Sequence, residues 1–433
     1  MLKLDAFALI TRTFPGRMCF INGIFERMKK ASVLVVLFFS VIRVLAQSGP
    51  EKHIFPLRLD ERKISITQLQ PMINEMGANR IVGLGEGTHG TKEFNDLRIS
   101  LIKELIENKG FRIICFENAF GDAYYFNEIV NSSGSIKEGM KKYLLSLWQN
   151  EEIETLFEWI REYNRSHSEK VSVSGMDFNY LANAAGIIIN ESKKANLYPL
   201  ASLANDLYRE ALQYDAAWDA QMKGLDRSRW GGQLKSIRSI LQQIDSSIKV
   251  DKLPVSELLQ TAVLSVRAWS TGERGRDRSM ALMAVQIAKN SKMIIWAHSV
   301  HLALKSPFKD NSVGGCGGYI KQEVPEYYSL GMGTAAGKYG GFDDRFDTRT
   351  NVMKRFVLPD VKHPSWDEYF FNMKLPAFFA DLRNAEKGTR SLPLRLIGYG
   401  PPQRISYSDA IKLEELFDGY IFISKTNAPG YFR

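Results

Sequence analysis

The segment Arg80-Ile-Val-Gly-Leu-Gly-Glu-Gly-Thr-His-Gly90 decides the fold. Residues 80–84 form a short apolar run with the length of a buried parallel strand, and a glycine-rich turn with two ionisable side chains follows them. Runs of the same kind predict further strands, at residues 111–116, 170–174, 292–296, 328–332, 394–397 and 419–424.

Helical patterns separate the early runs. Residues 94–108 place Leu97, Leu101 and Leu105 on one face and end before Gly110, and residues 152–163 repeat the pattern. This alternation predicts an α/β fold with a mostly parallel sheet flanked by helices. Because no convincing strand lies between about 181 and 288, we expect a helical insertion there that covers the site.

Ionisable side chains follow each of the first four predicted strands, where open parallel sheets place their sites. Glu86 and His89 follow the first strand, and Glu117 ends the second. Asp177 ends the third, and the Ala-His-Ser-Val-His string of residues 297–301 follows the fourth. Three of the six histidines therefore fall just after predicted strands, and we expect all these groups to meet at one edge.

A histidine flanked by carboxylates suits the activation of water. A carboxylate orients the imidazole, which takes a proton from water as the water attacks a carbonyl. Arginine or a second histidine can hold the developing oxyanion. The sequence has no Gly-x-Ser-x-Gly nucleophile elbow, which argues against a serine-dependent α/β hydrolase.

Other interpretations stay open for the same residues. Glu117 could pair structurally with Arg98, which lies early in the helix after His89, and Asp177 could simply form a turn. The histidines and glutamates could also bind a divalent metal, although they do not form the His-Glu-x-x-His helix of zinc proteases. We expect no required metal or other cofactor.

Several motifs resemble those of the erythromycin esterase family. The opening motif is Gly83-Leu-Gly-Glu-Gly-Thr-His-Gly-Thr-Lys-Glu-Phe94, followed by Arg98. Similar matches follow in family order, at Phe116-Glu-Asn118, Trp148 to Asn164, Gly175-Met-Asp177, Arg276-Asp-Arg-Ser-Met-Ala281 and Trp296-Ala-His-Ser-Val-His301. The resemblance extends from about residue 55 to 430, and residues 47–433 are expected to form one catalytic domain.

The resemblance implies hydrolysis of a macrolide-type lactone by activated water, and with it a role in antibiotic resistance. It implies that His89 is the general base and that the cleft is lined by Glu86, Glu117, Arg98, His298 and His301. Asp177 and Arg276 are assigned to substrate binding. Gly87, Leu282-Met283 and Ser299-Val300 depart from the family pattern, at or near the expected pocket, so the reaction type follows more firmly than the substrate.

The amino terminus has the features of a secretory signal. Basic residues at 29–30 precede an apolar run of about a dozen residues, and Ala46 offers a cleavage site. We expect a targeting segment at 1–46, starting at Met1 or Met28, and a periplasmic or secreted mature protein with no stable membrane insertion. An uncleaved membrane anchor is the alternative.

Charge gives no indication of a nucleic-acid partner. The net charge is +9, but seven basic and two acidic residues of the first 46 account for five of these charges, so the rest carries +4. We expect a small-molecule ester or lactone as the partner. The remaining alternative is a non-catalytic exported protein that binds a haem-type ligand through His298 and His301.

Overall fold

The computed structural model describes residues 53–223, 226–251, 255–272, 275–383 and 390–432. The expected targeting segment lies outside them. Strands are β1 Ile54–Leu57, β2 Leu59–Asp60, β3 Lys63–Ile64, β4 Ile81–Leu84, β5 Ile113–Ala119, β6 Ser172–Asp177, β7 Met293–Trp296, β8 Tyr327–Gly341, β9 Lys354–Val357, β10 Ala377–Asp381, β11 Arg395–Leu396, β12 Ser406–Tyr407 and β13 Gly419–Thr426. Helices are α2 Gln70–Ala78, α3 Lys92–Lys109, α4 Phe120–Val130, α5 Ile136–Tyr143, α6 Glu151–Ser166, α7 Ala182–Lys194, α8 Tyr198–Asp219, α9 Arg227–Asp251, α10 Glu257–Trp269, α11 Arg276–Ala288, α12 Ser299–Leu302, α13 Cys316–Glu323 and α14 Trp366–Asn372.

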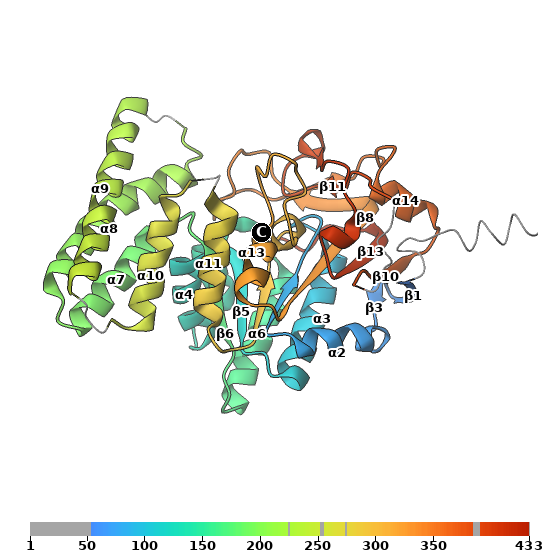
Figure 1. The fold of residues 1–433 in the computed structure, drawn as a ribbon, viewed down its shortest axis with the longest axis horizontal. Helices are drawn as coiled ribbons and strands as arrows, with labels where there is room; N and C mark the ends of the chain where they lie inside the picture. The colour runs from blue at the N-terminus through green and yellow to red at the C-terminus, as the bar shows by residue number, and fades with distance from the viewer. Residues whose placement is uncertain (1–52, 224–225, 252–254, 273–274, 384–389, 433) are drawn as a thin grey trace, which may run out of the picture.

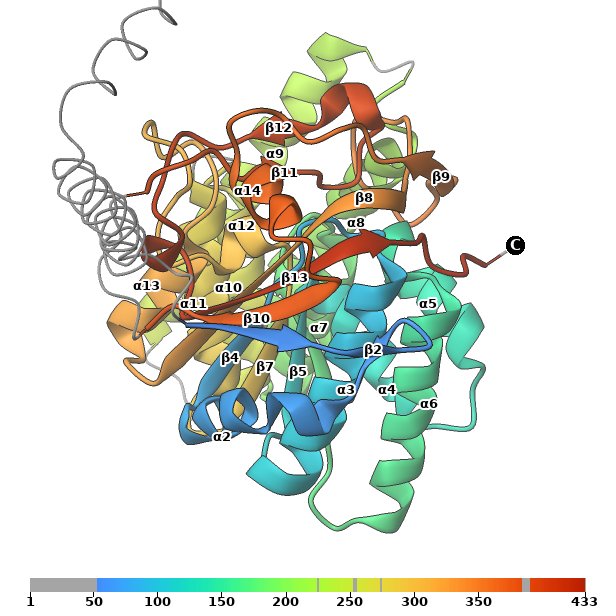
Figure 2. The ribbon, with the colours of Figure 1, turned by 90° about the vertical axis from the view of Figure 1, so that its right-hand side faces the viewer.

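The main sheet is mostly parallel, as predicted. Its strand order is β1-β10-β13-β8-β4-β7-β5-β6, with β9 paired to β8. Every pair from β13 to β6 is parallel, whereas β10 pairs antiparallel with β13, and β1 pairs antiparallel with β10 at the edge of the sheet (Figure 2). The chain therefore has the α/β fold that its strand–helix alternation indicates.

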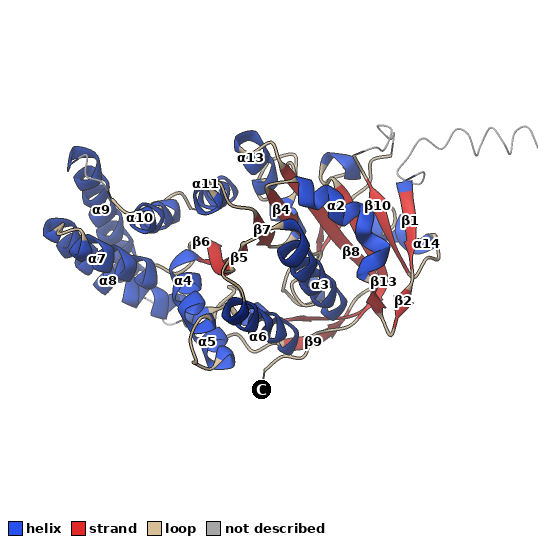
Figure 3. Ribbon diagram, turned by 90° about the horizontal axis from the view of Figure 1, so that it is seen from below, coloured by secondary structure: helices blue, strands red, loops and turns tan. Residues whose placement is uncertain are grey.

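Helices cover both faces of the sheet (Figure 3). Val82 and Leu84 pack with α2, α3 and α6 on one face, whereas Ile81 and Ile295 pack with α11 and α13 on the other. Side chains on a strand alternate between its two faces, so a strand buried on both faces must be apolar throughout. This explains why the four-residue strands β4 and β7, which are fully buried, consist of apolar residues throughout.

Two glycines have backbone roles that other residues would strain. Gly110 ends α3 in the left-handed conformation at φ 76°, the usual helix C-terminal role of glycine. A Cβ on Gly90 would lie 2.1 Å from the carbonyl oxygen of Gly340 in β8, so the turn after β4 packs directly on the neighbouring backbone. The Glu86–His89 turn is thereby pressed against the sheet edge.

Helices α7 to α11 occupy the segment between β6 and β7. Helices α7 to α10 extend beyond the β6 edge of the sheet, whereas α11 packs on its face (Figure 1). Two of them reach the cavity described below, through Trp218 near the end of α8 and Arg276 at the start of α11. The insertion thus contributes to the site mainly through the ends of its helices.

The predicted strand at 394–397 is wrong as a strand of the main sheet. Only Arg395–Leu396 is extended, as β11, and it pairs with β12 in a separate ribbon. Conversely, the sequence prediction missed β1 and β10. Pro56 lies in β1, and proline is tolerated there because β1 is an edge strand that needs no second partner.

Candidate active site

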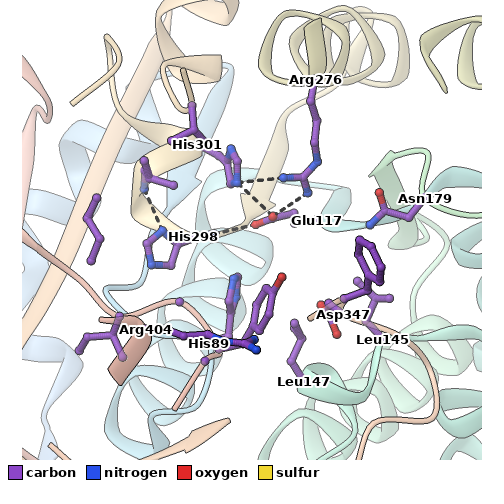
Figure 4. Close-up of a pocket in the computed structure, with 18 of the residues that line it drawn as sticks. His89, Glu117, Leu145, Leu147, Asn179, Arg276, His298, His301, Asp347 and Arg404 are labelled. Carbon is purple, nitrogen blue, oxygen red and sulfur yellow. Dashed lines mark hydrogen bonds and ion pairs between the residues drawn. The ribbon is translucent and has the colours of Figure 1, made fainter. Parts of the chain in front are cut away.

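The strand order places the predicted site residues side by side. Strands β4, β7, β5 and β6 are consecutive neighbours, all parallel, so their carboxyl ends share one edge. A cavity of about 440 Å³ opens at this edge. Figure 4 shows residues that line it. The predicted residues that line it are His89, Glu117, Arg276, His298 and His301.

Glu86 and His89 form a buried dyad. The Nδ1–H of His89 donates to Glu86 Oε1 at 2.7 Å, which leaves Nε2 without a proton. Arg98 donates to the other carboxylate oxygen, Glu86 Oε2, and stacks on Trp296 with its guanidinium carbon 4.0 Å from the ring centroid. Arg98 therefore pairs with Glu86 and not with Glu117, and the dyad is held from behind.

His298 lines the cavity and carries its proton on Nε2. Its Nδ1 accepts a hydrogen bond from the backbone N–H of Val300, which caps α12, so the proton resides on Nε2. Burial and the nearby rings of His89 and His301 lower the pKa of His298 to about 3, against the opposite effects of Glu117 and the Gly87 carbonyl. Nε2 is buried and makes no hydrogen bond of good geometry among the described residues, although the Gly87 carbonyl lies close enough to interact with it.

Glu117, Arg276 and His301 form a charged cluster at the back of the cavity (Figure 4). Glu117 Oε1 lies 2.9 Å from Arg276 Nη2 and 3.2 Å from His301 Nε2, and its Oε2 accepts the backbone N–H of His298 at 3.0 Å. Burial would raise the pKa of Glu117, but the positive charges of His301 and Arg276 hold it well below its ordinary value. Glu117 is thus an ionised carboxylate that orients three groups.

Two more carboxylates complete this cluster. Asp177 accepts from Arg276 at 2.5 Å, and Asp277 accepts from His301 Nδ1–H at 2.7 Å. Burial would lower the pKa of His301, but Glu117 and Asp277 raise it to about 10. His301 is therefore cationic at neutral pH, and its 3.2 Å approach to Arg276 Nη1 is a contact between two cations that share Glu117.

Aromatic side chains enclose His89. The rings of Trp148 and Tyr399 lie 5.4 Å and 6.2 Å from the His89 ring, measured between centroids. Trp218 and Phe346 extend this apolar wall on the side of the helical insertion. An apolar wall beside an ionised cluster suits an amphipathic organic substrate.

Most histidine nitrogens that could bind a metal ion already have hydrogen-bond or ion-pair partners in the protein. The Nδ1 atoms of His89 and His298 and both ring nitrogens of His301 have protein partners. Within the part of the chain that the structure describes, no three His, Cys, Asp or Glu side chains are placed to hold one metal ion. His301 is also poorly suited to be an axial haem ligand, because both of its ring nitrogens face carboxylates.

The structure brings together all eight residues that the sequence singled out, while their chemical roles stay predictions. Glu86 and Arg98 do not line the cavity as expected; like Asp177, they are buried behind the residues that do. Sequence reasoning missed Asp277, although it directly follows Arg276 and lies on the first turn of α11. It also missed Asp347 and Tyr399, which line the cavity from loops beyond β8 and β11. No strand or helix signal marks those two positions.

Comparison with known proteins agrees with the motifs. The model of the family described as Erythromycin esterase matches residues 106–426, which include the cluster from Glu117 to His301. The chain is similar to erythromycin esterase type II of Escherichia coli, with 24% identity over 416 residues that cover 87% of this chain and 96% of that protein.

Solved structures share the fold. The chain resembles a succinoglycan biosynthesis protein with a TM-score of 0.72 at 19% identity, covering 91% of this chain and 99% of that one. It also resembles the erythromycin esterase EreC in its open conformation, with a TM-score of 0.63 at 18% identity, covering 87% and 98%. The matched family range and the near full-length similarity together show that this chain belongs to the erythromycin esterase family.

Proposed function

We propose that the protein hydrolyses a carboxylic ester or lactone by direct attack of water activated by His89. The observation that carries this proposal is the Glu86–His89 pair, in which a buried carboxylate fixes the proton on Nδ1 and leaves Nε2 as the basic atom in a cavity. Family membership supports esterase chemistry.

The other groups have complementary roles. As the water oxygen attacks the carbonyl carbon, its proton passes to His89 Nε2, and Glu86 stabilises the imidazolium that results. The Nε2–H of His298 and the guanidinium of Arg276 offer donors for the oxyanion. Glu117 and Asp177 hold Arg276 in place. No step requires a metal.

A macrolide-type lactone is the substrate class we propose first, because the E. coli relative is an erythromycin esterase. Only some of the departures from the family pattern lie where they could affect the choice of substrate. Val300 lines the cavity, whereas Leu282 is exposed on α11 and Met283 packs in the core. These departures were expected at or near the pocket, and the two on α11 do not line it.

A substrate panel tests the proposal. Purified mature protein would be incubated with macrolactones and with simple aryl and alkyl esters, and ring opening or acid release followed by mass spectrometry. We expect hydrolysis of at least one class that His89→Ala abolishes. Absence of hydrolysis across the panel, with the protein folded, would contradict the proposal.

We further propose that the protein acts outside the cytoplasm, on the basis of the signal-like segment before Gln47. The described residues contain no helix that is both long and apolar enough to cross a bilayer. Amino-terminal sequencing of protein from the extracytoplasmic fraction should begin near Gln47. A start at Met1 or Met28 would contradict cleavage.

A further inference from the structure

Asp347 is a carboxylate of the cavity that the reaction described so far does not use. It lies in the loop between β8 and β9 and lines the cavity together with His89 and Glu117. In Figure 4 it lies across the cavity from Glu117 and Arg276. Its Oδ1 is shielded from solvent and has no hydrogen-bond partner among the described residues. The side chain as a whole is only partly buried, but a shielded carboxylate oxygen without a partner is costly unless it binds a proton or a ligand.

The loop around Asp347 is held from two sides. The indole N–H of Trp218 donates to the Asp347 carbonyl at 3.1 Å, and Gln221 exchanges two 2.8 Å hydrogen bonds with the backbone of Phe346. On the other side, the backbone N–H of Ser146 donates to the Thr348 carbonyl at 2.9 Å. The side chain of Asp347 is therefore carried by a fixed backbone and not by a free loop tip.

Burial and two nearby carboxylates favour the neutral form of Asp347, although Arg276, Arg345 and Arg404 line the same cavity. Glu117, Asp177 and Asp277 are three anions, and Arg276 and His301 are two cations, so the cluster is already net negative. Burial and repulsion by Glu117 and Asp177 raise the pKa of Asp347 well above its ordinary value, while Arg276 acts in the opposite direction. Tyr431 also lies within electrostatic range. The cavity thus holds a proton acceptor at His89 and a proton donor at Asp347, which is the arrangement that acid–base pairs use.

We propose that Asp347 is the general acid, which donates its proton to the alcohol oxygen as the tetrahedral intermediate breaks down. This step rests on the hydrolysis proposed above. The bond between water oxygen and carbonyl carbon forms while one water proton moves to His89 Nε2. The bond between that carbon and the alcohol oxygen then breaks, and the oxygen takes the Asp347 proton. Transfer of the His89 proton to Asp347 through water restores both groups, so the net reaction is ester plus water to acid plus alcohol.

The dependence of the rate on the leaving group can reveal whether a general acid takes part. Alkoxides of high pKa need the proton, whereas nitrophenolate leaves without it. We would measure kcat/KM for a series of esters of one acid, from 4-nitrophenyl to ethyl, with wild type and Asp347→Asn. Asp347→Asn should lower kcat/KM for the alkyl esters by about 10²-fold or more and for the nitrophenyl ester by less than about 10-fold. A plot of log kcat/KM against the pKa of the leaving alcohol should be steeper for Asp347→Asn than for wild type.

Asp343→Asn is the matched control, because Asp343 is an exposed aspartate of the same loop that pairs with Lys354 at the surface. It should leave the plot unchanged, and circular dichroism would check the fold of both variants. A uniform loss across the series, or a rise in KM alone, would overturn the assignment to Asp347 and favour a positioning or binding role. A wild-type protein that hydrolyses neither a member of the series nor a macrolactone would overturn the proposed function, and the general acid with it. If only a macrolactone is hydrolysed, Asp347→Asn should slow its ring opening by about 10²-fold or more, and an unchanged rate would overturn the general acid.

Discussion

The imidazole rings of His89 and His298 lie 5.2 Å apart between centroids, yet their protons are on different nitrogens. His89 donates through Nδ1 to Glu86, whereas His298 accepts through Nδ1 from the backbone of Val300. One ring therefore offers a basic nitrogen to the cavity and the other a donor. Two residues of the same type therefore suit opposite proposed roles, because the hydrogen-bond partner of Nδ1 differs between them.

The first prediction follows from the basic nitrogen of His89. His89→Ala should lower kcat by about 10²- to 10⁴-fold, the usual contribution of a general base. Glu86→Gln should cost nearly as much, since an amide no longer favours the required tautomer or the imidazolium. Steady-state kinetics on a verified ester substrate measure both, and near-normal turnover by His89→Ala would defeat the assignment.

The donor role of His298 can be tested separately. His298→Ala should lower kcat by about 10²- to 10³-fold, as expected for one lost oxyanion donor. His298→Gln, which retains an N–H group, should lose less. Because the pKa of His298 is about 3, its titration should leave no limb in the pH–rate profile between pH 5 and 8. Equal losses in the two variants would argue against donation to the oxyanion.

A third prediction concerns stability and pH. The pKa of His301 is raised from 6.5 to about 10, so its charge stabilises the fold fully below about pH 6.5 and ceases to do so as the pH rises through about 10. The free energy of unfolding should therefore fall between pH 7 and pH 10 more steeply in wild type than in His301→Gln.

Denaturant titrations at several pH values would measure this difference. His363→Gln is the control, because His363 pairs with Glu368 at the exposed surface. Its curve should follow that of wild type. If His301→Gln and wild type have parallel profiles, the Glu117–His301–Asp277 arrangement does not hold a charged imidazole.

The last prediction separates direct water attack from metal catalysis. Exhaustive chelation followed by dialysis should leave kcat within about twofold, a difference below 0.5 kcal/mol in the barrier. If a metal is required instead, activity should fall and return on adding a divalent cation. Substitution of each of the three histidines should then lower metal content together with activity, as elemental analysis would show.

The local sequence was sufficient to predict the central strands of the fold and most residues of the candidate site. The apolar four-residue runs at Ile81–Leu84 and Met293–Trp296 predict strands buried on both faces, and ionisable groups directly after them are expected at the sheet edge. These signals are local, because strand length, apolar content and the residue that follows can all be found within ten positions. Edge strands with partial exposure, such as β1, lack such a signal.

The tertiary structure decided which ionisable side chains of the site pair with one another. Glu117 faces Arg276 and His301, 159 and 184 positions along the chain, because β5 adjoins β7 and β6 in a strand order that does not follow the sequence. The pKa shifts depend on those distances, and one of them is the raised pKa of Asp347, which comes from a loop without periodicity. Electrostatic energy varies with separation in space, and chain position alone does not give that separation.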